Sequence, residues 1–276
     1  MMILVTGASG HVGSCIFRYL KNKGHKVIGL SRTSDKNNED IYCCDLKHEI
    51  PLDIHFDAIV HAAASKPTKM INLCDMYNDN VISTCMISKF ARKNGINKII
   101  YLGTVSSYGE VTGILNENSP RVNVSDYGMT KLLGERIIEK SGIDSYLLIL
   151  PGVVGCGCDE VWIERLVEDM KRNKEITIYN PKGDFNNIVH IDDLCNYIEC
   201  LIGRPCTEKK AKRLLLGCQK KIKIYRLVEL IRMLTSSKSK IVYDYSLLGG
   251  FSINCMNAID DGYISRDIDT IIKTVL

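Results

Sequence analysis

Residues 2–13, MILVTGASGHVG, decide the fold of this chain. The first five are almost all apolar and predict a buried strand, and three glycines, each three residues apart, follow directly. Glycines at this spacing let the backbone turn tightly, approach a pyrophosphate and pack a helix against the strand. A helix beginning there would direct its free N–H groups and positive dipole end at that anion. The stretch therefore predicts a dinucleotide-binding loop, with contacts from Gly7, Ser9, Gly10, His11, Val12 and Gly13.

Short aliphatic runs alternate with longer helical patterns outward from this loop. Such alternation predicts parallel βαβ units, because a parallel pair needs a crossover and a helix covers the face of the sheet. Apolar residues at nearly every position of the runs indicate a sheet that is buried on both faces. The predicted strands are 2–6, 26–30, 40–44, 56–62, 98–104 and 145–150, and the predicted helices begin near His11, Met70 and Ser125.

The pattern changes after residue 150. A helix is predicted at 159–173, a strand near 187–191 leads into another helix, and a further strand is predicted at 213–217. We therefore expect an α/β fold, with a Rossmann-type doubly wound parallel sheet and a smaller α/β substrate lobe at its carboxyl edge. The dinucleotide-binding domain is predicted at 1–150 plus about 188–202, and the substrate-binding lobe at 151–187 and 203–276.

The composition is that of an ordinary globular protein. Of 276 residues, 45% are hydrophobic, which excludes a disordered or fibrous chain. Lys and Arg (36) exceed Asp and Glu (32) by four, an excess too small to indicate nucleic-acid binding. No apolar run approaches the roughly 20 residues of a membrane span, and the N-terminus lacks the basic segment of a signal peptide. We expect a cytoplasmic protein that binds neither membrane nor nucleic acid.

The twelve cysteines form no disulfide framework or metal pattern that the sequence reveals. Between Cys15 and Cys255 there is no CxxC pair and no Cys/His cluster at zinc-ligand spacing, so free thiols are predicted. In VHIDDL, His190 with Asp192 and Asp193 resembles a metal cluster. An aspartate at that place is instead expected to cap the following helix, and no metal site is predicted.

The end of the second predicted strand bears on the choice of cofactor. An acidic residue there would accept hydrogen bonds from the adenosine ribose and favour NAD, whereas this chain has Ser31 and Arg32. A guanidinium pairs with a 2′-phosphate, so these residues favour NADP and leave NAD as the alternative. Asp45, just past the third strand, is a candidate to accept a hydrogen bond from the adenine amino group, and Leu46 beside it is predicted to contact the cofactor.

A tyrosine and a lysine four residues apart carry the second chemical signal. In SDYGMTKLLGE, residues 125–135, Tyr127 and Lys131 share one face of a predicted helix. The ammonium is expected to lower the pKa of the phenol from about 10 towards working pH, as a general acid/base requires. Thr104 and Ser106 follow the fifth strand, at the sheet edge where α/β folds bind ligands. Thr104 is thus predicted to hydrogen-bond a substrate oxygen.

Together these residues resemble the short-chain dehydrogenase/reductase superfamily, in the extended branch that contains nucleotide-sugar epimerases, dehydratases and 4-keto reductases. The glycine loop matches the TGxxGxxG of that branch, and Thr104, Tyr127 and Lys131 match its catalytic residues. PGVVG and VHIDDL match later landmarks. The resemblance implies further cofactor contacts from Ala62, Ala63, Ala64, Asn80, Tyr127, Lys131 and Pro151. It implies substrate contacts from Ser65, Ser106, Ser107, Tyr127 and Gly152.

The resemblance also implies a mechanism. Tyr127 exchanges a proton with a hydroxyl or keto oxygen of the sugar while a hydride passes to or from the nicotinamide. Lys131 holds the nicotinamide ribose, and Thr104 orients the reacting oxygen. Dehydratases of the branch carry an acidic pair after the catalytic threonine, because elimination needs a base. Val105 and Ser106 stand there in this chain, so dehydration is not expected.

Two arginines that members of the branch often carry are replaced in this sequence. Ile149 and Asn186 stand at or near their places. The second arginine usually grips the nucleotide diphosphate, and the candidates to substitute for it are Lys182, Arg172 and Arg204.

Three functions remain open. The first is NADPH-dependent reduction of a nucleotide-activated 4-keto sugar with Tyr127 as proton donor, favoured by Arg32, the short second lobe and the missing acidic pair. The second is an NAD(P)-dependent nucleotide-sugar 4-epimerase, which uses the same catalytic residues. The third, a non-catalytic dinucleotide sensor, is disfavoured because the tyrosine, lysine and threonine all persist. The resemblance further implies a homodimer that forms through a helix pair.

Overall fold

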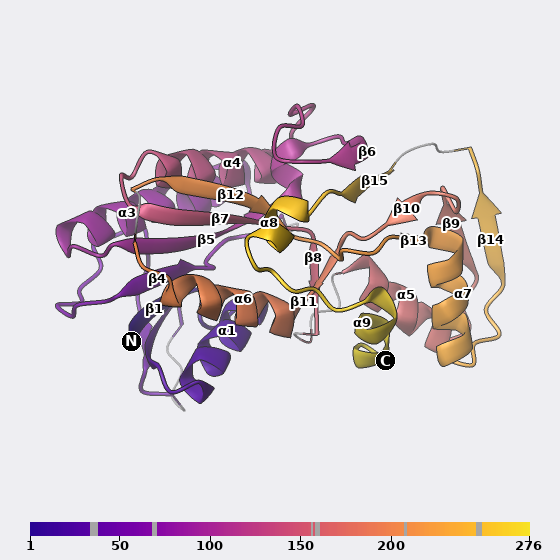
Figure 1. The fold of residues 1–276 in the computed structure, drawn as a ribbon, viewed down its shortest axis with the longest axis horizontal. Coiled ribbons are helices and arrows are strands. Elements are labelled where there is room, and N and C mark those ends of the chain that lie inside the picture. The colour runs from indigo at the N-terminus through magenta and orange to yellow at the C-terminus, as the bar shows by residue number, and fades with distance from the viewer. Residues whose placement is uncertain (34–37, 68–70, 156, 158–160, 207–208, 247–249) are drawn as a thin grey trace. The chain divides into compact units, whose positions relative to one another are not determined.

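A computed structural model gives the structure of the chain and describes residues 1–33, 38–67, 71–155, 157, 161–206, 209–246 and 250–276 (Figure 1). The chain divides into two compact units, each made of three segments. The first unit comprises 1–109, 121–149 and 195–214, and the second comprises 110–120, 150–194 and 215–276.

A seven-stranded sheet forms the centre of the first unit. Its strands are β1 (Met2–Thr6), β2 (Lys26–Ser31), β3 (Ile41–Cys43), β4 (Ala58–His61), β5 (Lys98–Thr104), β7 (Asp144–Leu150) and β12 (Ala211–Leu215). They lie in the order β12-β7-β5-β4-β1-β2-β3, and β1 pairs in parallel with both β2 and β4. The strand order therefore reverses at β1 and β4, which is where doubly wound sheets bind ligands at their carboxyl edge.

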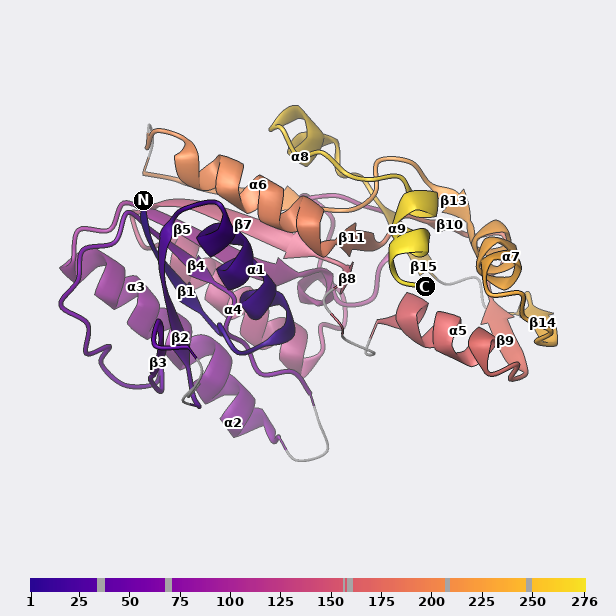
Figure 2. The same ribbon diagram turned by 90° about the horizontal axis from the view of Figure 1, so that it is seen from below.

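Helices cover both faces of this sheet. They are α1 (His11–Asn22), α2 (Leu73–Tyr77), the π-helical turn η1 (Asn78–Ile82), α3 (Ser83–Lys93), α4 (Asp126–Glu139) and α6 (Ile191–Gly203). Helix α1 lies on one face, and α3 and α4 lie on the other (Figures 1 and 2). Helix α1 buries Gly13, Ile16, Phe17 and Leu20, a spacing that places all four on one side. Helix α4 differs, because its buried face includes Lys131 and Glu135.

The predicted doubly wound parallel sheet is confirmed, and all six predicted strands occur. Strands β1 and β5 have the predicted bounds, and the core positions of β1 and β4 are fully buried, as aliphatic runs in a sheet covered on both faces require. The helix predicted to begin near Met70 starts at Leu73, and Met70 itself lies outside the described residues.

The second unit is built from small two-stranded sheets around its own apolar core. The parallel pairs are β8 (Gly152–Val154) with β11 (Ile188–His190), β9 (Ile176–Tyr179) with β14 (Ile241–Asp244), and β6 (Thr112–Leu115) with β15 (Gly250–Ile253). Strands β10 (Asp184–Phe185) and β13 (Ile222–Lys223) pair antiparallel. The helices are α5 (Trp162–Lys171), α7 (Ile224–Leu234), α8 (Met256–Asp260) and α9 (Ile268–Thr274). The core includes Leu166, Met170, Leu227, Ile231 and Ile271.

This division differs from the predicted boundaries in three segments, each for a reason of strand pairing. Residues 203–214 belong to the first unit, because β12 lies beside β7 at the edge of the large sheet. Residues 188–194 belong to the second, because β11 pairs with β8. Residues 110–120 also belong to the second, because β6 pairs with β15, which is distant in sequence.

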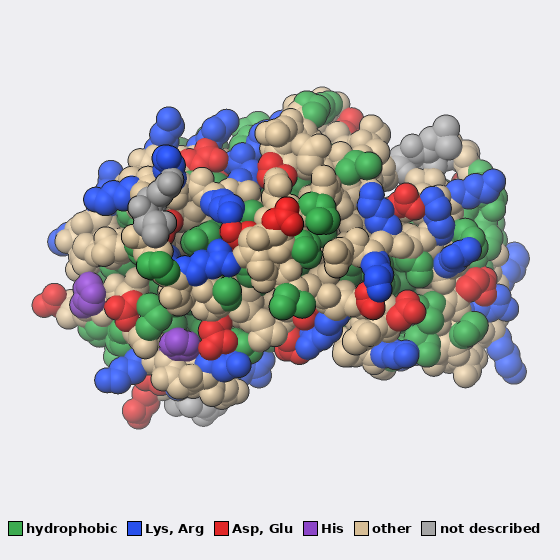
Figure 3. Space-filling view, viewed as in Figure 1, with side chains coloured by type: hydrophobic (Ala, Val, Ile, Leu, Met, Phe, Trp, Pro, Cys, Tyr) green, Lys and Arg blue, Asp and Glu red, His purple; other side chains and the backbone are tan. Residues whose placement is uncertain are grey.

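Charged side chains of both signs lie on the surface of the molecule that Figure 3 shows. Lys and Arg side chains are spread over the viewed face and are interspersed with Asp and Glu (Figure 3). Within the described residues, no helix combines the length and apolar character that crossing a bilayer requires. The cytoplasmic location expected from the sequence stays a prediction.

Candidate active site

The glycine loop after β1 forms a tight cradle at the start of α1. Gly7 has φ +69°, and a Cβ there would lie 2.8 Å from the backbone of Ala63. A Cβ on Gly13 would lie 2.1 Å from the carbonyl oxygen of Gly7. In the part of the chain described, no side chain caps the first turn of α1, and that turn holds no acidic residue. Its N–H groups and positive dipole end therefore suit a phosphate anion.

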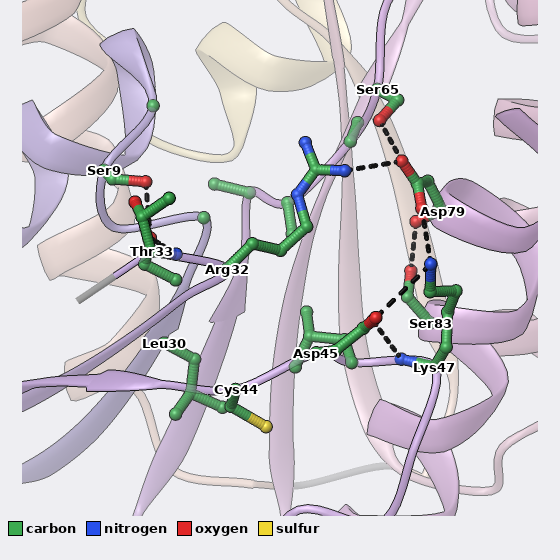
Figure 4. Close-up of a pocket in the computed structure, with 17 residues that line it drawn as sticks. Ser9, Leu30, Arg32, Thr33, Cys44, Asp45, Lys47, Ser65, Asp79 and Ser83 are labelled. Carbon is green, nitrogen blue, oxygen red and sulfur yellow. Dashed lines mark hydrogen bonds and ion pairs between the residues drawn. The ribbon is translucent and has the colours of Figure 1, made fainter. Parts of the chain in front are cut away.

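A cavity of about 230 Å³ opens beside this cradle (Figure 4). It collects the ends of β1, β2, β3 and β4, as expected at a strand-order reversal. The predicted cofactor residues that line it are Gly7, Ser9, Gly10, Ser31, Arg32, Asp45, Leu46, Ala62, Ala63 and Ala64, and Ser65, predicted for the substrate, lines it too. Leu30, Thr33, Cys44, Lys47, Asp79 and Ser83 complete the lining. His11, Val12, Gly13, Asn80, Tyr127, Lys131 and Pro151 are not among its lining residues.

Charges gather at one end of this cavity around Asp79, which the sequence analysis did not single out. Arg32 extends towards Asp79, and its Nη1 lies 2.8 Å from Oδ2 (Figure 4). Lys47 Nζ lies 3.6 Å from Asp79 and 3.3 Å from Asp45, and Ser65 donates its hydroxyl hydrogen to Asp79. The Asp45 carboxylate hydrogen-bonds Lys47 and raises its pKa. The only signal in the sequence was that Asp79 precedes Asn80.

Buried hydrogen bonds hold the segment after β4 that forms the wall of the cavity. Thr6 Oγ1 lies 2.7 Å from His61 Nδ1 and accepts from the N–H of Ala63. His61 Nε2 lies 3.0 Å from Thr84 Oγ1. Burial, with the nearby charge of Lys131, lowers the pKa of His61 to about 3, so the imidazole stays neutral. His61 therefore positions the wall and carries no charge into it.

Asn80 connects that wall to the helix that carries Tyr127. Its side chain accepts from the N–H of Ser65 at 2.7 Å and donates to the Ser65 carbonyl oxygen at 3.0 Å. It also donates to Thr130 Oγ1 at 3.0 Å. Because Asn80 is buried and its amide is engaged on both sides, it ties α4 to the cavity wall. The cofactor contact that the resemblance implies for Asn80 stays a prediction.

The predicted catalytic residues lie at the carboxyl end of β5 and the start of α4. Thr104 ends β5 and accepts from the N–H of Ser106 in the 3₁₀ turn η2 (Val105–Tyr108). Ser107 is buried and donates to the Thr104 carbonyl oxygen at 2.8 Å. Gly128, which follows Tyr127, lets α4 approach this turn, because a Cβ there would lie 2.1 Å from the Ser106 carbonyl oxygen.

The electrostatics of Tyr127 and Lys131 differ from the expectation. Burial raises the pKa of Tyr127 above its usual value, opposed by the charge of Lys66, so the predicted lowering by Lys131 is not seen. Burial also lowers the pKa of Lys131 to about 8, opposed by the charge of Glu135. In both groups burial is the largest cause of the pKa shift. Lys131 Nζ lies 4.3 Å from the centre of the Tyr101 ring, a cation–π contact.

The second unit contains the remaining predicted residues and a cavity of its own. Pro151 and Gly152 belong to it, and a Cβ on Gly152 would lie 2.7 Å from Val161 Cγ1. The cavity is about 630 Å³ in volume. Its lining includes Trp162, Tyr179, Lys182, Asn187, Lys223 and Phe251. Of the three cations considered for a diphosphate, only Lys182 is among its lining residues.

Asn186, which stands where the resemblance expects an arginine, has a structural role. It is fully buried, and its Nδ2 donates to the carbonyl oxygens of Cys218 and Ile253, each at 2.8 Å. Its Oδ1 accepts from the N–H of Ile253 at 2.7 Å. The side chain therefore joins backbone from three parts of the second unit and presents no group to a ligand.

The cluster in VHIDDL is an ion-pair network. Arg266 lies 3.0 Å from the Asp192 carboxylate, contacts His190 and donates its backbone N–H to Asp193. Among the described residues, no group of three or more His, Cys, Asp or Glu side chains is placed to hold a metal ion. The network instead ties the segment before α9 to the start of α6.

Comparisons with known proteins agree with this architecture. Residues 3–217 match the NAD dependent epimerase/dehydratase family. An uncharacterized UDP-glucose epimerase, YtcB, of Bacillus subtilis is 25% identical, over 90% of this chain and 87% of the relative. A putative UDP-glucose 4-epimerase of Methanocaldococcus jannaschii is 26% identical, over 88% of this chain and 85% of the relative. The match to the UDP-glucose 4-epimerase of Azospirillum brasilense, 25% identical, spans 51% of this chain and 44% of that protein.

Solved structures match over nearly the whole chain. UDP-glucuronic acid 4-epimerase from Bacillus cereus, in complex with NAD, superposes with a TM-score of 0.82 at 19% identity, covering 99% of this chain and 94% of that one. The UDP-Glc/GlcNAc 4-epimerase from Campylobacter jejuni gives 0.78 at 18% identity, covering 99% and 97%. At these identities the likeness establishes the fold. Together with the family match over residues 3–217, it shows that this chain belongs to the NAD-dependent epimerase/dehydratase family of the extended short-chain dehydrogenases/reductases.

Proposed function

We propose that the chain is a nucleotide-sugar 4-epimerase that works with a nicotinamide dinucleotide. The observation that carries the proposal is the position of Thr104, Tyr127 and Lys131, which come from the end of β5 and the start of α4 in the unit that holds the glycine cradle. The names of the relatives, which are UDP-glucose epimerases, support 4-epimerisation over 4-keto reduction.

The residues present fit a bound dinucleotide. Gly7 and Gly13 leave space that a Cβ would fill, and the start of α1 suits a pyrophosphate. A nicotinamide dinucleotide held there would supply the acceptor, and then the donor, of the hydride at C4 of the sugar. Tyr127 takes the proton of the C4 hydroxyl and gives a proton back to the keto oxygen. Thr104 orients that oxygen, and the ammonium of Lys131, which lies against the Tyr101 ring, would hold the nicotinamide ribose.

Replacing Tyr127 by Phe tests this assignment. The phenol oxygen is then lost, so turnover should fall by about 10²–10⁴-fold, the usual contribution of a general acid/base. Binding of the dinucleotide, measured by calorimetry, should stay within about twofold of the wild type. Full turnover in the Tyr127→Phe variant would contradict the mechanism, and loss of dinucleotide binding would assign the residue to the cofactor alone.

A second candidate is NADPH-linked reduction of a 4-keto nucleotide sugar, and Arg32 favours it. Arg32 and Lys47 both lie at the end of the cavity where an adenosine 2′-phosphate would bind. A reductase must exchange its cofactor in every turnover, whereas an epimerase returns the hydride and can retain it. We would therefore denature the purified protein and identify any dinucleotide released. Stoichiometric NAD supports the epimerase, whereas an empty protein that binds NADPH better than NADH supports the reductase.

We propose that the cavity of the second unit takes the nucleotide part of the substrate. Trp162 and Tyr179 offer aromatic surface, and Lys182 offers a positive charge where Asn186 cannot. Replacing Lys182 by Met should raise the KM for a UDP-sugar about tenfold, the loss of roughly one charge-assisted hydrogen bond, with kcat changed little. Arg172→Met is the matched control, because Arg172 is a surface residue outside the cavity, and an equal effect of both variants would contradict the assignment.

We further propose that two copies of the chain associate through α2 and α4. These helices lie against each other, and each exposes two large apolar side chains one turn apart. The four side chains are Leu73, Tyr77, Met129 and Leu133, each at least 38% exposed. Adjacent exposed apolar residues indicate an interaction surface. Leu133→Glu should convert a dimer to a monomer in analytical ultracentrifugation, whereas a wild type that sediments as a monomer would refute the proposal.

A further inference from the structure

Helix α4 carries a third ionisable residue on the face that holds Tyr127 and Lys131. Glu135 follows Lys131 by four residues, so residues 127, 131 and 135 succeed one another along one side of the helix. The side chain of Glu135 is 0% exposed. Burying a carboxylate destabilises the fold unless cations and hydrogen bonds stabilise its charge. The residues that contact Glu135 therefore indicate its role.

The compensating charge comes mainly from the edge strand β12. Arg213 Nη2 lies 2.9 Å from Glu135 Oε2 and 2.7 Å from Glu139 Oε1, so one guanidinium bridges two carboxylates of α4. Arg121 Nη2 lies 3.9 Å from Glu135, and its guanidinium stacks 4.7 Å from the centre of the Tyr108 ring. Glu135 is therefore fixed from outside its own helix, by residues that are distant in sequence.

The other side of Glu135 faces the strand that ends in Thr104. A Cβ on Gly103 would lie 3.2 Å from Glu135 Oε1, so the carboxylate packs against β5 one residue before Thr104. The charge of Glu135 opposes the fall in the pKa of Lys131 that burial causes. Tyr101 on the same strand donates its hydroxyl hydrogen to the Lys131 carbonyl oxygen and presents its ring to the ammonium.

We propose that Glu135, held by Arg213, is a positioning residue that keeps the ammonium of Lys131, one helical turn away on α4, charged. The inference rests on the proposed function, in which the charged ammonium of Lys131 holds the nicotinamide ribose. The groups that face Glu135 are Lys131 and Glu139 on α4, Tyr101 on β5, Ser107 on η2, Arg121, and Arg213 on β12. Of these groups, Lys131 precedes Glu135 by one turn of α4 and is the one assigned to the catalytic site.

The direct test is to titrate Lys131 by NMR in protein labelled with ¹³C at the lysine ε carbon. The Lys131→Arg spectrum identifies the signal, and no turnover is needed. In Glu135→Gln, which removes the charge and keeps the shape, the midpoint should move to lower pH by about one unit, a tenfold change in protonation. Glu139→Gln is the matched control, because Glu139 shares Arg213 but lies two turns from Lys131, and its midpoint should match the wild type.

The pH profile of kcat gives a second readout. In Glu135→Gln the alkaline fall in kcat should begin about one pH unit lower, while dinucleotide binding at about pH 6, where Lys131 is still charged, is unchanged. If Glu135→Gln does not fold, Arg213→Gln should move the Lys131 midpoint in the same direction, because an unsupported carboxylate is neutralised.

An unmoved midpoint in Glu135→Gln, or an equal shift in Glu139→Gln, would overturn the inference. If no nucleotide sugar is turned over, the proposed function fails, while the NMR titration still decides the role of Glu135.

Discussion

Asp79 and Glu135 are both carboxylates held by arginine, but their surroundings differ. Asp79 lies at a cavity rim, and its partner Arg32 is 63% exposed. Glu135 is fully buried, and its partner Arg213 is 16% exposed. At the rim, water can solvate either charged group when the other is removed. In the interior, no solvent takes the place of a lost partner. The rim pair is therefore suited to exchange its partner for a ligand phosphate, and the buried pair is suited to hold a geometry.

The largest effect should come from breaking the buried pair. Arg213→Ala leaves the Glu135 carboxylate buried without its main cation, which costs about 3–5 kcal/mol of unfolding free energy. Arg32→Ala, which breaks the rim pair, should cost at most about 1 kcal/mol. Chemical denaturation of the two variants measures the difference. Similar losses in both would mean that the two pairs are not distinct.

Lys131 in the interior and Lys47 at the rim should change the stability of the fold with pH in opposite directions. The pKa of Lys131 is about 8 in the folded chain, below its value of 10.5 when unfolded, so Lys131 destabilises the fold below pH 8 and stability recovers as pH rises towards 10.5. Lys131→Met should therefore stabilise the protein at pH 7, on the order of 1–3 kcal/mol. The pKa of Lys47 is raised by Asp45, so its contribution is present below pH 10.5 and is lost above. Unfolding curves of Lys131→Met and Lys47→Met from pH 7 to 11 should show slopes of opposite sign relative to wild type.

Residues that form a pattern within one element could be predicted from the sequence. Ion pairs between residues far apart in the chain could not. The glycine loop, the six strands and the Tyr127–Lys131 pair depend on spacing within one element, which a sequence displays. Asp79 and Arg213 matter because folding brings them to Arg32 and Glu135, which are 47 and 78 residues away. The pKa of Tyr127 was misjudged for the same reason, because burial depends on what packs around the phenol.

A moderate effect is expected at the rim. Asp79→Asn removes the carboxylate that pairs with Arg32 and Lys47. A 2′-phosphate can then bind these two cations without competition from Asp79. Affinity for NADP should rise up to about fivefold, the equivalent of roughly 1 kcal/mol of released ion pairing, while affinity for NAD changes little. Calorimetry on both dinucleotides checks this, and Asp75→Asn, on the preceding helix and outside the cavity lining, is the control. Parallel changes for both dinucleotides would place Asp79 away from the phosphate.

The smallest effect is that of salt. Raising ionic strength from 0.05 to 0.5 M shortens the Debye length from more than about 10 Å to less than about 5 Å. The difference in unfolding free energy between wild type and Arg32→Ala should then vanish, whereas that for Arg213→Ala should persist. Denaturation at the two salt concentrations measures both differences. Equal screening of the two would show that solvent reaches the Glu135 cluster.

Asn186 has a consequence for redesign. Its amide makes three hydrogen bonds to the backbone of Cys218 and Ile253, so the position serves the architecture of the second unit. Grafting an arginine there to restore a grip on phosphate would unfasten those segments before it could reach any ligand. Engineering of substrate affinity should therefore begin at the cavity lining near Lys182.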